Sequence, residues 1–252
     1  MVQAQNPSLL SQAVLLVNLD SGQVLGAENA HIPHQPASLA QLLTALLVVE
    51  ELDADRWVLV SPAAAEAPGA QKGLLPYQLV RTDALLEDML LMSASDAAWA
   101  LAEAVGGSVN EFVLLMNERA EELGMKHSHF TNPMGLDEPG QYTTAADLAK
   151  LAQAVVQHPR ILAITAHQNF VWRISGADGL KAGCTQEGGY STIISAKRDG
   201  THLVVIVLGA KTPNQRWLDA IRWLDFGFSR YGSLLKEPMI ADVNGHRSSA
   251  HP

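Results

Sequence analysis

Three short segments of the sequence combine a side chain that could react or carry charge with a special backbone setting. Ser38 precedes a long apolar run, at a helix start whose free N–H groups would stabilise negative charge. Ser93 and Ser95 lie close together, inside or next to a second helical pattern. Lys181 lies between two glycines, where the backbone could approach a ligand closely. These residue types would suit nucleophilic chemistry at a serine.

Two of these segments also have a purely structural interpretation. Ser38 and Gln41 form the pattern S-x-x-Q, a capping box that usually serves only to start a helix. A serine such as Ser93 is more often a helix irregularity than a catalyst. Taken one at a time, the segments therefore leave structural and catalytic roles open.

The cysteine and histidine residues give little support for a metal or redox site. Cys184 is the only cysteine, which excludes an internal disulfide, and a buried, inert thiol is expected there. His31 with His34, and His127 with His129, have spacings that a metal could use, but neither pair has a third ligand pattern. Surface or loop histidines are the simpler interpretation, so we expect no metal and no cofactor.

Strand patterns occur at both ends of the chain. Ala13 to Asn18 and Val24 to Leu25 are separated by turn residues and predict an opening hairpin. A second hairpin is predicted from Tyr190 to Ala196 and from His202 to Gly209, because Asp199-Gly200 between them is a strong turn signal. An amphipathic helix is expected to follow it. Both termini should therefore contribute to one antiparallel sheet.

The middle of the chain is predominantly helical in pattern. Four helices are predicted: 39–49 with Ser38 at its N-terminal edge, 82–105 ended by Gly106 and Gly107, about 108–123 closed by Gly124, and one capped by Thr144 that ends before Pro159. We therefore expect an α/β (α+β) fold in one catalytic domain of two lobes. The sheet lobe would take about 1–50 and 160–252, and the helical lobe about 51–159.

Composition and charge exclude several classes of protein. The 252 residues include 17 basic and 26 acidic side chains, a net charge of −9, and no clustered basic stripe, so nucleic acid is an unsuitable partner. With 48% hydrophobic and 17% charged residues, the chain is too apolar to be mainly disordered. The apolar stretches are shorter than the roughly 18 residues of a membrane span, and the start lacks a signal-peptide pattern.

Six segments, in this order, carry a family resemblance. They are Pro36-Ala37-Ser38-Leu39, Leu91 to Ala98, His129 to Leu136, Tyr142 to Ala149, Asp178 to Gly183, and Ser195 to Gly200. With the opening hairpin, they make the chain resemble the serine D-alanyl-D-alanine carboxypeptidases, the low-molecular-mass penicillin-binding proteins, over nearly its whole length. The resemblance implies a β-lactamase/transpeptidase-like fold: an antiparallel sheet from both chain ends, flanked by helices, with a helical lobe.

The resemblance also implies a chemistry and roles for individual residues. The family performs acyl transfer with S-x-x-K, S-x-N and K-T-G elements. Mapped here, Ser38 is the nucleophile, Ser93 is the relay serine, and Lys181 binds the substrate carboxylate at a third motif completed by Ala182 and Gly183. The implied ligands are the peptidoglycan stem peptide or a β-lactam, and the implied location is outside the cytoplasm, in the periplasm or cell envelope. If the chain is complete, it lacks the β-rich C-terminal domain and amphipathic tail that the family often carries.

Three positions depart from the family pattern. Gln41 occupies the place of the first-motif lysine, Ser95 that of the asparagine, and Ala182 that of the threonine. An amide cannot take a hydroxyl proton near neutral pH, so the usual activation of Ser38 is missing. Activity is therefore expected to be strongly impaired, with Lys181 conceivable as a replacement base. The alternative is a catalytically inactive homologue that binds cell-wall peptide or a protein partner.

Overall fold

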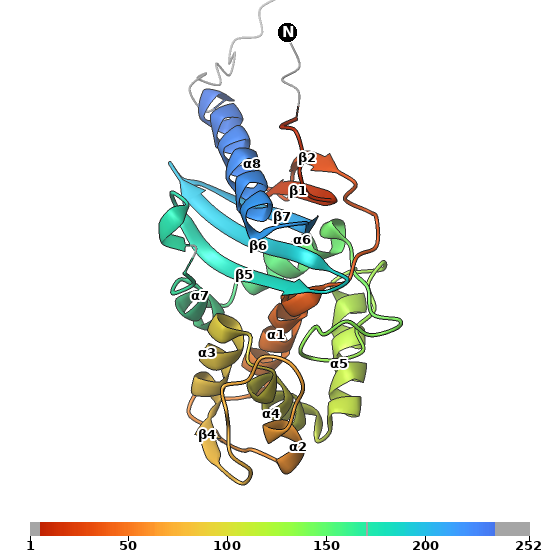
Figure 1. The fold of residues 1–252 in the computed structure, drawn as a ribbon. Helices are drawn as coiled ribbons and strands as arrows, with labels where there is room; N and C mark the ends of the chain where they lie inside the picture. Colours follow the sequence, from red (N-terminus) through yellow and green to blue (C-terminus); the bar gives the residue numbers. More distant parts are fainter. Residues whose placement is uncertain (1–5, 170, 235–252) are drawn as a thin grey trace, which may run out of the picture.

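A five-stranded antiparallel sheet built from both ends of the chain forms the upper part of the molecule (Figure 1). The computed structural model of the protein describes residues 6–169 and 171–234. The strand order is β2-β1-β7-β6-β5, with β1 Ala13–Asn18, β2 Val24–Glu28, β5 Ala177–Thr185, β6 Gly189–Arg198 and β7 Thr201–Ala210. The pairing of β1 with β7 joins the two ends, so the predicted sheet is confirmed.

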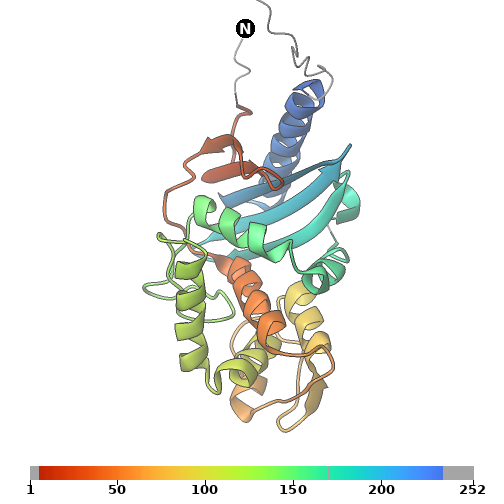
Figure 2. The same ribbon diagram turned by 180° about the vertical axis from the view of Figure 1, so that it is seen from behind.

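Helices cover both faces of this sheet. The long helix α8 (Pro213–Leu234) packs on one face, and α6 (Ala145–Val155) packs on the other (Figures 1 and 2). Alternate residues of β7 point to opposite sides, so that Val204 and Ile206 join the core under α6 whereas Val205 joins the core under α8. Coverage of both faces explains why β7 is a continuous apolar run rather than an alternating one.

The helices α3, α4, α5 and α7 pack around α1, which runs from the sheet into the lower part of the molecule (Figure 2). Residues 41–48 of α1 are buried on every side, as expected for a central helix. The other elements are the 3₁₀ helices η1 (Ala37–Ala40) and η2 (Val171–Arg173), α1 (Gln41–Glu51), α2 (Pro62–Ala65), α3 (Thr82–Met92), α4 (Ser95–Gly106), α5 (Val109–Glu122), α7 (Pro159–Thr165), and the strands β3 (Trp57–Leu59) and β4 (Leu79–Arg81).

Two helices begin at side-chain caps, of which the one at Thr144 was predicted. The hydroxyl of Ser108 accepts a hydrogen bond from the N–H of Glu111 at 3.2 Å, and that of Thr144 accepts one from Asp147 at 3.1 Å. Each cap satisfies an N–H that the first turn leaves free. The starts of α5 and α6 are therefore set by local sequence.

The predicted helix over 82–105 is wrong as a single element, because the chain breaks between α3 and α4. Ser93 has a left-handed conformation with φ +58°, and it ends α3. Tertiary hydrogen bonds hold the break: Ser95 donates its N–H to the carbonyl of Ala70 at 2.6 Å. The break places Ser93 at the end of one helix and Ser95 at the start of the next.

The predicted capping box at Ser38 and Gln41 is also wrong. Ser38 lies inside η1, and the residue before α1 is Ala40, which makes no side-chain cap. Gln41 is fully buried and turns its side chain toward Ser93 instead. The Ser38 side chain therefore does not cap α1.

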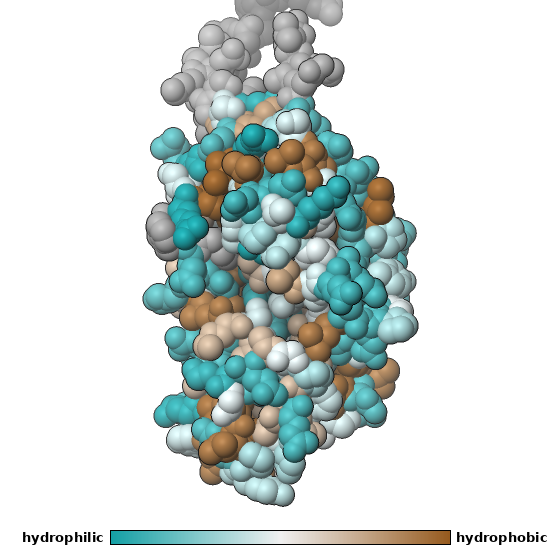
Figure 3. Space-filling view, viewed as in Figure 1, coloured by the Kyte–Doolittle hydropathy of each residue, from teal (hydrophilic) through white to brown (hydrophobic). Residues whose placement is uncertain are grey.

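The outer surface mixes apolar and polar side chains (Figure 3). The large exposed apolar residues include Trp57, Leu59 and Leu79, which lie on the small β3–β4 sheet. None of the described helices combines the length and apolar character that a membrane span requires.

Candidate active site

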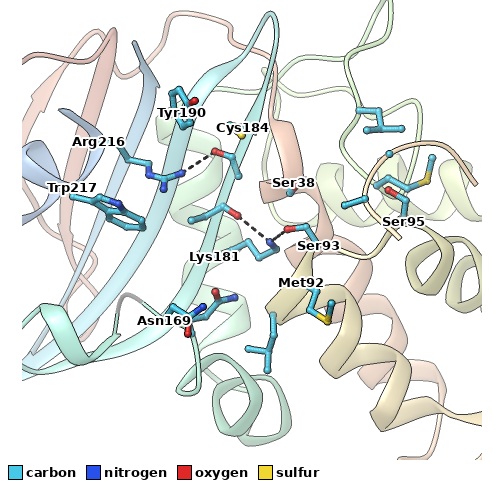
Figure 4. A pocket seen from close by; sticks show the side chains of 18 of the residues that line it. Ser38, Met92, Ser93, Ser95, Asn169, Lys181, Cys184, Tyr190, Arg216 and Trp217 are labelled. Atoms are coloured by element: carbon cyan, nitrogen blue, oxygen red, sulfur yellow. Dashed lines mark hydrogen bonds between the residues drawn. The ribbon is translucent and has the colours of Figure 1, made fainter. Parts of the chain in front are cut away.

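A cleft of about 640 Å³ lies between the outer strand β5 and the helices below it. Ser38 from η1, Ser93 and Ser95 from the α3–α4 break, and Lys181 from β5 all line it. Figure 4 shows these residues converging on the cleft from different elements. The structure thus brings together all the residues that the sequence singled out for chemistry.

The backbone around Ser38 is fixed by close packing against a glycine. Ala37 has φ +50°, and a Cβ on Gly135 would lie only 1.9 Å from the Ala37 carbonyl oxygen. Asn132 holds this glycine by accepting its N–H at 2.8 Å. The segment 129–136, which carries part of the family resemblance but had no predicted role, therefore packs against the turn that presents Ser38.

Strand β5 approaches Ser38 from the other side, also through a glycine. A Cβ on Gly183 would lie 2.8 Å from the Ser38 backbone nitrogen and 3.0 Å from its Cβ. Real Cβ atoms do not come so close to backbone, so only glycine permits this contact. The family resemblance places Gly183 in the third motif, and this close contact with Ser38 is a steric reason for a glycine at that position.

Gln41 ties the Ser38 helix to the α3–α4 break. Its Nε2 donates to the backbone carbonyl of Ser93 at 3.3 Å, and its Oε1 is buried without a hydrogen-bond partner among the described residues. This contact brings the elements that carry Ser38 and Ser93 together. The side chain that links these two elements is thus the neutral amide of Gln41.

Lys181 is the buried cation of the cleft, with only 1% of its surface exposed. Its Nζ donates hydrogen bonds to Ser93 Oγ and, at 3.0 Å, to the Ala182 carbonyl (Figure 4). Burial, and after it the positive charge of Arg216, lower the pKa of Lys181 to about 7, while Cys184 acts in the opposite sense. Neither of these hydrogen bonds goes to Ser38.

Arg216 on α8 is a second buried cation that the sequence did not reveal. It is 8% exposed, donates to the Gly183 carbonyl at 3.1 Å and stacks over Trp217 at 4.0 Å. Burial lowers its pKa to about 10, and it forms no salt bridge with a carboxylate among the described residues. No local sequence signal marks it, because its place depends on how α8 packs against the sheet. Two cations thus make the cleft favourable for an anion.

Ser95 lies beneath a loop that forms the lower rim of the cleft. It is 2% exposed, and a Cβ on Gly69 would lie 2.7 Å from its Oγ. The neighbouring Asp96 holds the same loop by accepting the backbone N–H groups of residues 72, 73 and 74 at 2.8–3.0 Å. Burial alone would raise the pKa of Asp96, but these hydrogen bonds outweigh it and lower the pKa. Asp96 therefore fixes the rim as a carboxylate.

Two further expectations concern cysteine and metals. Cys184 is exposed and lines the cleft, so the expected burial of its thiol is wrong. Its position on the outer strand next to Gly183 accounts for the exposure. Within residues 6–169 and 171–234, His, Cys, Asp and Glu side chains form no group of three that could hold a metal ion.

Comparisons with known proteins show the family to which the chain belongs. The family model for D-alanyl-D-alanine carboxypeptidase matches residues 1–212. D-alanyl-D-alanine carboxypeptidase DacF of Bacillus subtilis is 33% identical over 88% of this chain, which spans 63% of that relative. DacB2 of Mycobacterium tuberculosis is 32% identical, with 87% of this chain and 82% of the relative covered.

Solved structures show the same architecture. The crystal structure of a D-alanyl-D-alanine carboxypeptidase from Mycobacterium tuberculosis superposes with a TM-score of 0.86 at 30% identity, over 90% of this chain and 94% of that one. The DD-transpeptidase of Streptomyces K15 shares the fold, with a TM-score of 0.85 at 23% identity over 89% of this chain and all of that one. By its sequence, its sheet topology and these likenesses, the chain belongs to the D-alanyl-D-alanine carboxypeptidase family.

Proposed function

We propose that the protein is a serine acyl-transfer enzyme acting at Ser38 on cell-wall peptides that end in D-alanyl-D-alanine, with strongly impaired turnover. The observation that carries the proposal is the convergence of Ser38, Ser93 and Lys181 on one cleft. β-Lactams would acylate the same serine. We also propose that the protein acts in the cell envelope, as the family does.

The reaction has two halves. The Ser38 oxygen attacks the carbonyl carbon between the two D-alanines, and the terminal D-alanine leaves as the C–N bond breaks. Water then hydrolyses the Ser38 ester. The N–H of Ser38 lies where β5 contacts η1, and it is a candidate donor to the oxyanion.

The cleft offers two basic side chains for the terminal carboxylate of the substrate. Lys181 and Arg216 are both buried, and Arg216 forms no salt bridge with a described carboxylate. A guanidinium can hold a carboxylate by two parallel hydrogen bonds. Arg216 therefore compensates in part for Ala182, which lacks a hydroxyl that would contribute about 1.5 to 3 kcal/mol.

The impairment follows from the three departures from the family pattern. Gln41 cannot accept a proton from Ser38, and general base catalysis is typically worth about 10²- to 10⁴-fold. Ser95 is shorter than asparagine and has no amide to hold the substrate peptide group. Because residues of one catalytic unit do not act additively, these losses cannot simply be multiplied.

The second candidate function is a protein that binds stem peptide, or a protein partner, without turnover. The observation that favours it is the neutral amide of Gln41, buried beside Ser93 where the family has a lysine. Such a protein would keep the shape and charge of the cleft. It would give peptide binding without a covalent intermediate.

The two functions are separated by D-alanine release from a stem-peptide mimic ending in D-alanyl-D-alanine. We expect slow release by the native chain and none above background by Ser38→Ala, with peptide binding measured by calorimetry for both. Binding with no release above background by either protein would favour the binding function, whereas equal release above background by both would show that Ser38 is not the nucleophile.

A further inference from the structure

The cleft contains a basic group that can substitute for the missing lysine. Resting on the function proposed above, we propose that Lys181, acting through the Ser93 hydroxyl, is the general base for Ser38. Lys181 would then accept and return protons, and Arg216 would bind the substrate carboxylate. This division of roles differs from one in which Lys181 serves only as the carboxylate anchor.

The geometry of Lys181 supports a proton relay. Its Nζ is in hydrogen-bond contact with Ser93 Oγ, and it is 1% exposed, so water does not compete for this contact. Gln41 Nε2 holds the Ser93 carbonyl at 3.3 Å, which keeps the α3–α4 break against the helix that follows Ser38. The relay also needs a hydrogen bond of about 3 Å between Ser93 Oγ and Ser38 Oγ. Hydrogen bonds between catalytic groups are commonly long in the free enzyme and shorten when substrate binds.

The charges around Lys181 favour its neutral form. The charged or titratable groups that affect it are Arg216 on α8 and Cys184 on β5, and its hydrogen-bond partner Ser93 is neutral. Burial and the Arg216 charge bring the pKa of Lys181 to about 7. About half of the molecules would therefore hold a neutral amine at pH 7, against less than about 0.1% for an ordinary lysine.

The proton transfers balance without a co-reactant. Neutral Lys181 takes the proton of Ser93, Ser93 takes the proton of Ser38, and the Ser38 oxygen forms the new bond to the carbonyl carbon. The electron pair of the carbonyl moves to its oxygen. When the C–N bond breaks, the leaving amine recovers a proton from Ser93, and Lys181 returns to its neutral form.

The test is the pH dependence of Ser38 acylation by a penicillin, followed by mass spectrometry. We expect the second-order rate to rise about tenfold per pH unit below 7 and to level off by about pH 8, because the rate follows the neutral amine. Lys181→Arg keeps a positive charge but cannot give up its proton, so we expect about a 10²- to 10⁴-fold loss. Lys211→Arg, at an exposed lysine outside the cleft, is the matched control.

A second variant separates the relay from a structural role. Arg216→Gln removes the like charge next to Lys181, so the midpoint of the pH profile should move to higher pH, whatever happens to the rate. An acylation rate that is flat or falls as pH rises through 7 would overturn the relay, as would a Lys181→Arg rate within tenfold of native. If a Ser38 adduct forms but with either of these results, the relay is contradicted and the proposed function is not. If no adduct forms at any pH, both the relay and the proposed function are contradicted.

Discussion

Restoring the family residues by Gln41→Lys, Ser95→Asn and Ala182→Thr together is expected to raise D-alanine release at least about 10²-fold. The lysine would supply a base next to Ser38, a contribution typically worth about 10²- to 10⁴-fold, and the other two changes would add contacts to the substrate amide and carboxylate. The measurement is D-alanine release from a stem-peptide mimic at saturating and limiting concentrations.

Two controls keep this result interpretable. Gln41→Met has a similar volume but no basic group, so it should give no increase. Ser95 lies under the Gly69 loop, with its Oγ 2.7 Å from where a Gly69 Cβ would be, so thermal melting must show that the restored protein is folded. A folded triple variant that releases D-alanine no faster than native would show that these positions do not limit activity.

Placing a methyl group between β5 and Ser38, by Gly183→Ala, is expected to reduce acylation by a penicillin about 10²-fold. The new Cβ would lie 2.8 Å from the Ser38 nitrogen, so η1 or β5 must move apart. A misplacement of about 1 Å at reacting groups can cost this much, because orientation supplies a large part of catalysis. The rate of adduct formation, measured by intact mass, checks the effect.

Gly200→Ala is the matched control for this variant. Gly200 lies in the β6–β7 turn with φ +80° and no atom within 4 Å of an added Cβ, so alanine there strains only the turn. We expect a stability loss of about 1 kcal/mol and an unchanged acylation rate. If Gly183→Ala acylates as fast as this control, the close approach of β5 is not needed to position Ser38.

Much of the fold could be predicted because the relevant signals are local. The hairpin of β6 and β7 follows from two apolar runs around Asp199-Gly200, and the starts of α5 and α6 follow from the caps at Ser108 and Thr144. The resemblance of the three motifs to those of the family likewise indicated which serines and which lysine would meet. Patterns of this kind are complete within a few residues of sequence.

The features that could not be predicted depend on contacts between distant segments. Nothing in the residue type of Ser93 requires φ +58°; the break there is held by bonds to Gln41 and Ala70. Similarly, the sequence pattern predicted Gln41 in a capping box, but its side chain donates to the Ser93 carbonyl instead. Arg216 reaches the Gly183 carbonyl only because α8 packs across the sheet.

The most direct test of Ser38 as an acyl-transfer nucleophile is the intact mass of the native chain after prolonged incubation with a penicillin. We expect one adduct with the mass of the intact penicillin, formed slowly because Gln41 cannot act as a base, mapped by peptide digestion to Ser38 and absent from Ser38→Ala. An unmodified mass for the folded native chain, or an adduct of the same yield in Ser38→Ala, would contradict this assignment.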